Sequence, residues 1–175
     1  MKTNRISLTV AAVAMLAGAA PTVADQDGAV AMRDAAVTRP LTSEKAEQLR
    51  RDAEALFSQP KQWKKAARLL EESAALRSAN DAEGYECLVY AGRIRAAIGD
   101  MDSARAALEQ AATHALARGA IVEAAQAYID AAHAAIALKD ARGARELVDR
   151  AALLAESPLL SAQQRALLNV RLAVV

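Results

Sequence analysis

The sequence has very few aromatic residues, and this scarcity limits the fold classes open to it. Aromatic residues make up 3% of the 175 residues, and alanine dominates the apolar positions. Alanine is the strongest helix former because it loses no side-chain entropy, whereas strands are enriched in β-branched and aromatic residues. The composition therefore favours an all-helical chain and disfavours a β-sandwich.

The sequence is also poor in cysteine and histidine. Cys87 is the single cysteine, so no disulfide can form within one chain. We expect its side chain to be a small buried apolar group, the alternative being a reactive or intermolecular thiol. His114 and His133 are the only histidines, and no metal-ligand spacing joins them. No phosphate-binding glycine loop is present either, so we predict no catalytic residues, no metal and no cofactor, and hence no enzyme.

Strong charge of either sign is absent as well. The formal net charge is +1, although charged residues make up 25% of the chain. A nucleic-acid-binding protein that depends on a basic field needs a clear excess of lysine and arginine. We therefore expect no nucleic-acid partner.

The first residues have the pattern of a secretory signal. Lys2 and Arg5 form a positive start, and an uncharged apolar run follows over residues 6–20. This run is shorter than the roughly 20 residues that cross a bilayer as a helix. Ala24 precedes Asp25 at a small-residue cleavage position, and no lipid-accepting cysteine lies nearby. We predict a signal peptide over 1–24, a periplasmic or secreted location, and no stable membrane insertion after cleavage; the alternative is an uncleaved anchor.

The rest of the chain is predicted to consist of helices after a short lead-in. Residues 25–42 lack a clear period and are predicted to be flexible. From residue 43 onward apolar residues recur at helical spacing, with Gly, Asp, Asn and Pro at the breaks. Seven helices are expected, over about 42–58, 60–79, 81–98, 100–119, 120–138, 141–155 and 161–175.

The helices repeat in pairs. Alanines at positions 66, 104 and 144 occupy the same place in three motifs, with spacings of 38 (104 − 66) and 40 (144 − 104). Ala53, Ala91 and Ala131 are in register on the preceding helices. The domain 43–175 is therefore predicted to hold three helical hairpins and a capping helix, over 43–79, 81–119, 120–156 and 160–175.

The middle copy resembles the tetratricopeptide repeat. It has small residues, a Gly-Asp turn and spaced apolar residues at the family's positions, namely Gly92, Gly99-Asp100, Ala104, Leu108 and Ala111. The resemblance implies a right-handed superhelix of about three repeats. The period is longer than the usual 34 residues, which resembles long-helix variants. Glu54 replaces a small residue in the first copy, where looser packing is expected, and Arg95 replaces an aromatic one.

The resemblance also implies a function, that of an exported scaffold that holds a protein or peptide on a concave face. Carried over by position, the residues expected to contact the partner there are Arg51, Tyr90, Arg93, Ile129 and His133. Two donors at equivalent positions, Arg93 and His133, suit a carboxylate or an acidic stretch of peptide. An ordinary solvated face is the alternative. Two other functions stay open: a self-assembling envelope protein that associates through its C-terminal helix, and an enzyme or lipid carrier on a helical scaffold.

Overall fold

The structure, a computed structural model, describes residues 42–175, and all the regular elements in this range are helical. A first helix covers residues 42–54, and a short 3-10 helix, η1 (Pro60–Gln62), leads into α2 (Trp63–Ala75). The other helices are α3 (Ala82–Ala97), α4 (Met101–Ala117), α5 (Ile121–Ala137), α6 (Ala141–Ala155) and α7 (Ala162–Leu172). The predicted signal peptide and nearly all of the predicted lead-in lie outside the described residues.

The prediction of an all-helical chain is confirmed for the described residues, and the seven expected helices occur in the expected order. The first two are shorter than predicted. The first gives way to turns over residues 55–58, and α2 ends at Ala75, before the predicted end at 79. No glycine follows the C-terminal end of either helix, so the sequence has no clear helix-stop signal at these two positions.

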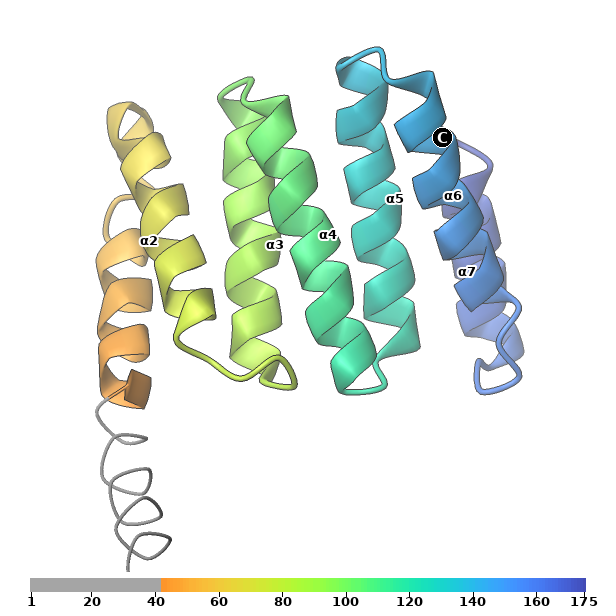
Figure 1. The fold of residues 1–175 in the computed structure, drawn as a ribbon, viewed down its shortest axis with the longest axis horizontal. Coiled ribbons are helices and arrows are strands. Elements are labelled where there is room, and N and C mark those ends of the chain that lie inside the picture. Colours follow the sequence, from red (N-terminus) through yellow and green to blue (C-terminus); the bar gives the residue numbers. More distant parts are fainter. Residues whose placement is uncertain (1–41) are drawn as a thin grey trace, which may run out of the picture. The chain divides into compact units, whose positions relative to one another are not determined.

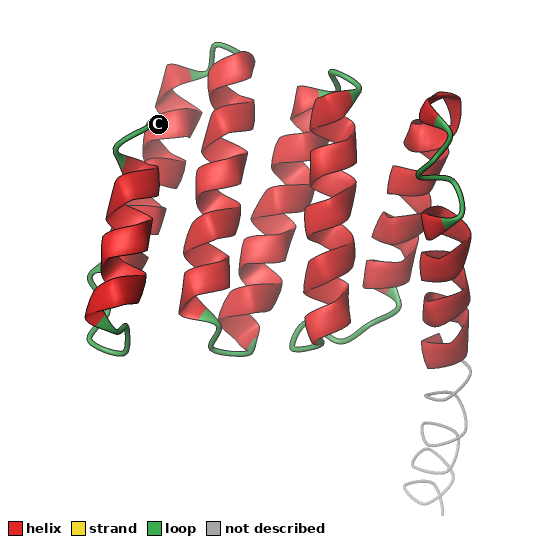
Figure 2. Ribbon diagram, turned by 180° about the vertical axis from the view of Figure 1, so that it is seen from behind, coloured by secondary structure: helices red, strands yellow, loops and turns green. Residues whose placement is uncertain are grey.

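The helices form two rows of antiparallel neighbours. In Figure 1, α2, α4 and α6 lie toward the viewer, and Figure 2 shows the first helix, α3, α5 and α7 from the opposite side. Each helix from α2 to α6 packs on the next along the chain, and α5 also contacts α7. Adjacent helices therefore cover one another, as expected for stacked hairpins.

Side-chain caps fix where the later helices begin. Asp81, Asp100 and Asp140 each accept a hydrogen bond from a backbone N–H in the first turn of α3, α4 and α6. Ser161 forms a reciprocal capping box with Gln164 at the start of α7. The cap Asp100 stands at the predicted start of its helix, at residue 100.

Three turns between helices share one backbone geometry. Gly99, Gly119 and Lys139 have φ values of 81°, 74° and 61°, and they follow α3, α4 and α5. The next amide in each turn donates to a carbonyl five residues back, as in Asp100 to Arg95 and Asp140 to Ala135, both 2.9 Å. This is the Schellman ending of a helix, in which glycine is the usual residue at the left-handed position. Lys139 adopts that conformation with a side chain, which is unfavourable.

Lys139→Gly is therefore expected to stabilise the protein by about 1 kcal/mol, because glycine has no Cβ to crowd the carbonyl in this conformation. Urea unfolding of wild type and variant measures the difference. Gly99→Lys is the reciprocal control, since it puts lysine in the equivalent turn at φ 81°, and it is expected to lower stability by a similar amount. Equal stability of Lys139→Gly and wild type would contradict this account of the turn.

The core consists mainly of alanine. The repeat alanines Ala66 and Ala104 are 0% exposed, and Ala144 is 6% exposed. Small side chains let helix axes approach closely, and Gly92 marks the tightest point: a Cβ there would lie 2.6 Å from Leu108 Cγ. Cys87 is buried as predicted, and burial raises the pKa of its thiol.

The first hairpin departs from the other two at the expected position. Glu54 is exposed and pairs with Arg50, whereas its counterparts Gly92 and Ala132 are buried. Arg95, which replaces the aromatic residue, is only 12% exposed and binds two carboxylates, those of Glu71 on α2 and Asp100 at the cap of α4. These two partly buried ion pairs connect α2, α3 and the start of α4.

Candidate functional site

An apolar pocket lies where the first hairpin meets α3. It has a volume of about 230 Å³, and its walls come from the turn after the first helix, the start of α2 and the last turns of α3. Its lining residues are Phe57, Trp63, Tyr90, Arg93, Ile94 and Ala97. The chain has five aromatic residues (one Trp, three Tyr, one Phe), and three of them line this one pocket. We call it the aromatic pocket.

Local contacts hold the aromatic side chains in place. The Trp63 indole N–H donates a hydrogen bond of 2.9 Å to the Phe57 carbonyl, so the polar atom of the ring is satisfied within the protein. The Phe57 and Tyr90 rings lie 6.3 Å apart between centroids, with a tilt of 39°. Such tilted pairs are favourable beyond their buried area. Tyr90 is nevertheless 50% exposed, so part of its ring is free to contact another molecule.

Arg93 supplies the positive charge of the pocket. Its ion-pair partner within the chain, Asp130, also binds a second arginine. Asp130 on α5 lies 3.8 Å from Arg93, but it accepts a hydrogen bond of 2.6 Å from Arg171 on α7. The Arg93 side chain is 62% exposed. Arg93 reaches the other oxygen of Asp130 only at ion-pair distance and makes no hydrogen bond to it, so its guanidinium keeps donors for an anion from outside.

The structure places the predicted contact residues in three different settings. Tyr90 and Arg93 come together in the aromatic pocket. Arg51 on the first helix and His133 on α5 are exposed, but neither lines this pocket. Ile129 is 0% exposed and belongs to the core, so the expected apolar contact from it is wrong. On an alanine-rich helix that packs on α4, α6 and α7, a large apolar side chain fills the interior.

Two residues of the pocket are not among the predicted contact residues. Phe57 and Trp63 are partly buried, and they form walls of the pocket. Helical periodicity does not place them, because Phe57 lies in the turns after the first helix and Trp63 is the first residue of α2. The available signal was compositional, since two of the five aromatic residues (one Trp, three Tyr, one Phe) stand close together on either side of Pro60.

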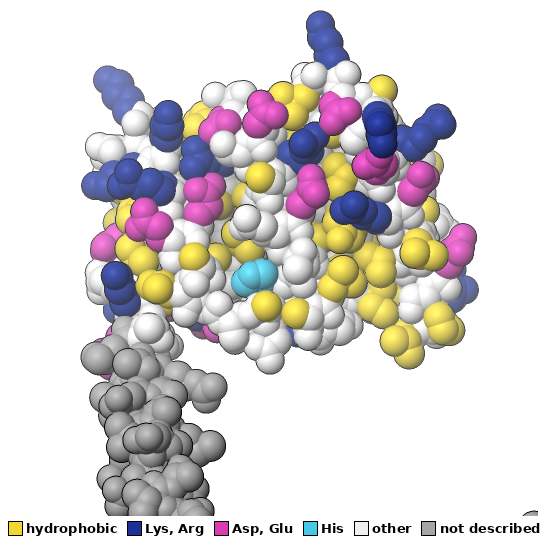
Figure 3. Space-filling view, in the orientation of Figure 1, with side chains coloured by type: hydrophobic (Ala, Val, Ile, Leu, Met, Phe, Trp, Pro, Cys, Tyr) yellow, Lys and Arg dark blue, Asp and Glu magenta, His cyan; other side chains and the backbone are white. Residues whose placement is uncertain are grey.

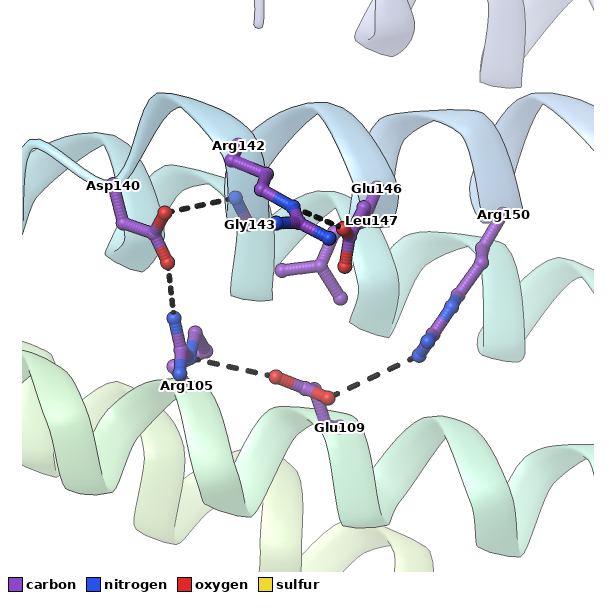
Figure 4. Close-up of a pocket in the computed structure, with 8 residues that line it drawn as sticks. All are labelled: Arg105, Glu109, Asp140, Arg142, Gly143, Glu146, Leu147 and Arg150. Atoms are coloured by element: carbon purple, nitrogen blue, oxygen red, sulfur yellow. Dashed lines mark hydrogen bonds and ion pairs between the residues drawn. The ribbon is translucent and has the colours of Figure 1, made fainter.

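A second hollow, of about 330 Å³, lies between α4 and α6, but its charges are already paired (Figure 4). Arg105 binds Asp140 at 2.8 Å and reaches Glu109 at 3.5 Å, and Glu109 also faces Arg150 at 4.0 Å. Hydrogen bonds from the Gly143 backbone and from Arg105 hold the pKa of Asp140 below its ordinary 3.8. These contacts connect α4 to α6 and leave few groups for a ligand.

His114 is partly buried on α4. Its Nδ1 is buried and has no hydrogen-bond partner among the described residues. Burial lowers the pKa of His114 below the ordinary 6.5, and the charge of Asp81 opposes this effect. The folded protein therefore binds a proton at His114 less readily than the unfolded chain does.

Stability is consequently expected to fall on acidification, starting near pH 6.5. Above the pKa of His114 in the unfolded chain, the residue is neutral in both states, and protonation of His114 takes nothing from the free energy of unfolding. Below it the unfolded chain binds a proton first, so stability falls until the folded pKa is reached. His114→Gln is expected to lose this dependence, measured by urea unfolding between about pH 7.5 and about pH 5. The exposed His133→Gln is the control and is expected to retain it; an unchanged dependence in His114→Gln would contradict the assignment.

Other site classes find little support among residues 42–175. No group of three or more His, Cys, Asp or Glu side chains there is arranged to hold a metal ion. None of the helices in this part of the chain is both long and apolar enough to cross a membrane. Comparison of the chain with family models, curated proteins and solved structures found no match. The site must therefore be interpreted from its own geometry.

Proposed function

We propose that the protein is a binding module that holds a segment of another protein, with the aromatic pocket as the anchor. The observation that carries this proposal is the gathering of Phe57, Trp63 and Tyr90 around one apolar pocket, with Arg93 beside them. Aromatic side chains and arginine are the residues that dominate binding energy at protein interfaces. We further propose that the chain is exported and that its hairpins form a tetratricopeptide-like superhelix.

The chemistry of the pocket suits a peptide that has an apolar side chain close to a carboxylate. The apolar side chain enters the pocket against the rings of Phe57, Trp63 and Tyr90, where burial of its surface drives binding. The carboxylate pairs with the guanidinium of Arg93, which can donate two parallel hydrogen bonds. Such a ligand uses both properties of the pocket, whereas a purely apolar ligand leaves Arg93 partly desolvated and unpaired.

The proposal is tested by selecting peptides from a displayed random library on the wild-type protein. Selected peptides are then measured against Ala97→Trp, which fills the pocket from an exposed position without removing a contact residue. We expect enrichment of peptides with an apolar residue near an acidic one. We expect Ala97→Trp and Arg93→Glu each to weaken their binding at least about tenfold.

Leu167→Trp, at an exposed position on α7, is the matched control and is expected to bind as wild type does. Peptides that bind Ala97→Trp as tightly as wild type, or a selection that enriches nothing, would overturn the proposal.

Self-assembly is a second candidate, favoured by the apolar surface near the C-terminus. Leu159, Val170 and Val174 are 80%, 65% and 76% exposed. Figure 3 shows apolar side chains gathered at the lower right, over the end of α6 and the chain beyond it. Exposed apolar side chains that lie close together favour association with another apolar surface. Sedimentation equilibrium tests this: a monomer at high concentration would exclude it.

A further inference from the structure

A group of exposed basic side chains lies at the start of α2. Lys61, Lys64, Lys65 and Arg68 line a hollow of about 380 Å³, together with the partly buried Arg95 of α3. We call the first four the basic cluster. Figure 3 shows positively charged side chains at the upper left, over the beginning of α2. The whole chain has a formal net charge of only +1, so this is a local concentration of charge.

The charges of the basic cluster are largely unbalanced within the protein. Arg68 reaches Glu72 at 3.3 Å, but none of the three lysines has an ion pair among the described residues. The other nearby acid, Glu71, is held by Arg95 at 2.9 Å. The lysines therefore remain free to interact with an anion from outside.

The spacing of two members of the cluster opposes helix stability. Lys64 and Arg68 are four residues apart within α2, whereas Lys61 lies in the short 3-10 helix before it. Like charges at this spacing face each other along a helix and destabilise it. Elsewhere on the protein the same spacing is used for opposite charges, as in Arg142 with Glu146 at 3.0 Å. A stabilising helix surface would not have this arrangement, so it requires another explanation.

The basic cluster adjoins the aromatic pocket. Trp63, a wall of the pocket, stands between Lys61 and Lys64 in the first turns, and Ile94 of the pocket precedes Arg95 of the basic hollow. The aromatic pocket and the basic hollow are thus lined by neighbouring residues of α2 and of α3, although no residue lines both. The basic cluster therefore begins within one residue of a pocket wall along the chain.

We propose that the basic cluster selects an acidic peptide segment, whose apolar side chain occupies the aromatic pocket and whose flanking Asp and Glu residues lie along Lys61, Lys64 and Lys65. This rests on the proposed function and names its class of ligand. A peptide fits better than an anionic membrane surface, because the apolar element beside the lysines is a hollow. A membrane-binding patch needs apolar side chains that protrude into the lipid.

The test uses the double variant Lys64→Glu, Lys65→Glu in the full chain. Folding is not at risk, because both positions are exposed and Lys64→Glu replaces the like-charge pair with Arg68 by an opposite-charge pair. We expect the variant to melt no lower than wild type. The probes are a fluorescein-labelled peptide with a central Leu-Phe flanked by Asp and Glu, and a matched peptide flanked by Asn and Gln. Fluorescence anisotropy measures both affinities at low and high salt.

Wild type is expected to bind the acidic peptide about tenfold more tightly than the neutral one, and to lose this preference in high salt. The double variant is expected to lose the preference while it still binds the neutral peptide. Arg142→Glu, Arg145→Glu on α6 makes the same change of net charge at exposed positions and is the control.

The outcomes separate the two proposals. If wild type binds both peptides equally and the double variant does too, the basic cluster does not select the ligand, but the aromatic pocket still binds peptides. If neither peptide binds, the proposed function itself fails. Binding of wild type to vesicles that contain anionic phospholipid, lost in the double variant and without binding of either peptide, would assign the cluster to a membrane surface instead.

Discussion

Ala104→Glu is expected to destabilise the protein by about 3–5 kcal/mol, a large fraction of the roughly 5–15 kcal/mol by which domains are ordinarily stable. Ala104 is 0% exposed, and its carbonyl oxygen would lie 3.3 Å from a Cβ at Gly92. The backbones of α3 and α4 are thus close at this point, and no space exists for a longer side chain. A glutamate must either bury an unpaired charge or push the two helices apart. Thermal and urea unfolding measure the loss.

The control is the same substitution two residues further along α4. Ala106 is exposed, so Ala106→Glu adds a charge to the same helix without burying it. We expect its stability to stay within about 0.5 kcal/mol of wild type. Ala144→Glu, at the equivalent buried place in α6, is expected to behave like Ala104→Glu. If Ala104→Glu melted within a degree or two of wild type, the packing role of the repeat alanines would be refuted.

Gly92→Val is expected to cost about 3 kcal/mol, or about 10 °C in melting temperature. A Cβ at position 92 would lie 2.6 Å from Leu108 Cγ and 2.9 Å from its Cδ2, and Leu108 is only 3% exposed. The leucine cannot move away without opening the interface of α3 with α4. Gly92→Ala is expected to cost less, about 1 kcal/mol, because alanine is smaller and recovers helix propensity.

Two comparisons isolate the clash. Glu86→Val, at an exposed position on α3, changes helix propensity without crowding, and a loss of only about 0.5 kcal/mol is expected. Leu108→Ala removes the crowded side chain, so the double variant Gly92→Val, Leu108→Ala is expected to lose less than the sum of the two single losses. Strictly additive losses would show that position 92 and Leu108 do not interfere.

The helices were predictable because local signals agree with tertiary packing over most of the chain. The turns at Gly99 and Gly119 are marked by glycine, and the caps Asp100 and Ser161 have the side chains that bind free amides. The turn at Lys139 has no glycine to mark it. Its position was still predicted, because the repeat requires the two helices around it to form a hairpin. The ends of the first helix and α2 were misplaced, since only weak local signals mark them.

The candidate site was less predictable than the helices. Tyr90 and Arg93 were carried over by position from the resemblance to the tetratricopeptide repeat, and both line the aromatic pocket on a regular helix. Phe57 and Trp63 could not be predicted, because they flank an irregular turn whose path depends on tertiary contacts. Ile129 was misassigned because position in a repeat does not tell whether later helices cover it; α5 contacts α7 as well as α4 and α6.

The availability of Arg93 is a property that only the three-dimensional structure reveals. Arg171 is 41 residues from Asp130, and the two are joined at 2.6 Å only because α7 packs on α5. Arg93 of α3 pairs with the other oxygen of the same carboxylate at 3.8 Å, beyond hydrogen-bond distance. The last helix is thus connected to the candidate site through Asp130, which both arginines approach.

The most direct test of the proposed binding role is photo-crosslinking from the aromatic pocket in the native environment. A photoreactive phenylalanine analogue replaces Tyr90, which is 50% exposed, and in a separate protein it replaces Leu167, which is 51% exposed. We predict a defined crosslinked polypeptide from position 90 that disappears when Arg93→Glu is added, and none of that size from position 167. The same product from both positions, or one that persists with Arg93→Glu, would contradict a binding role for the aromatic pocket.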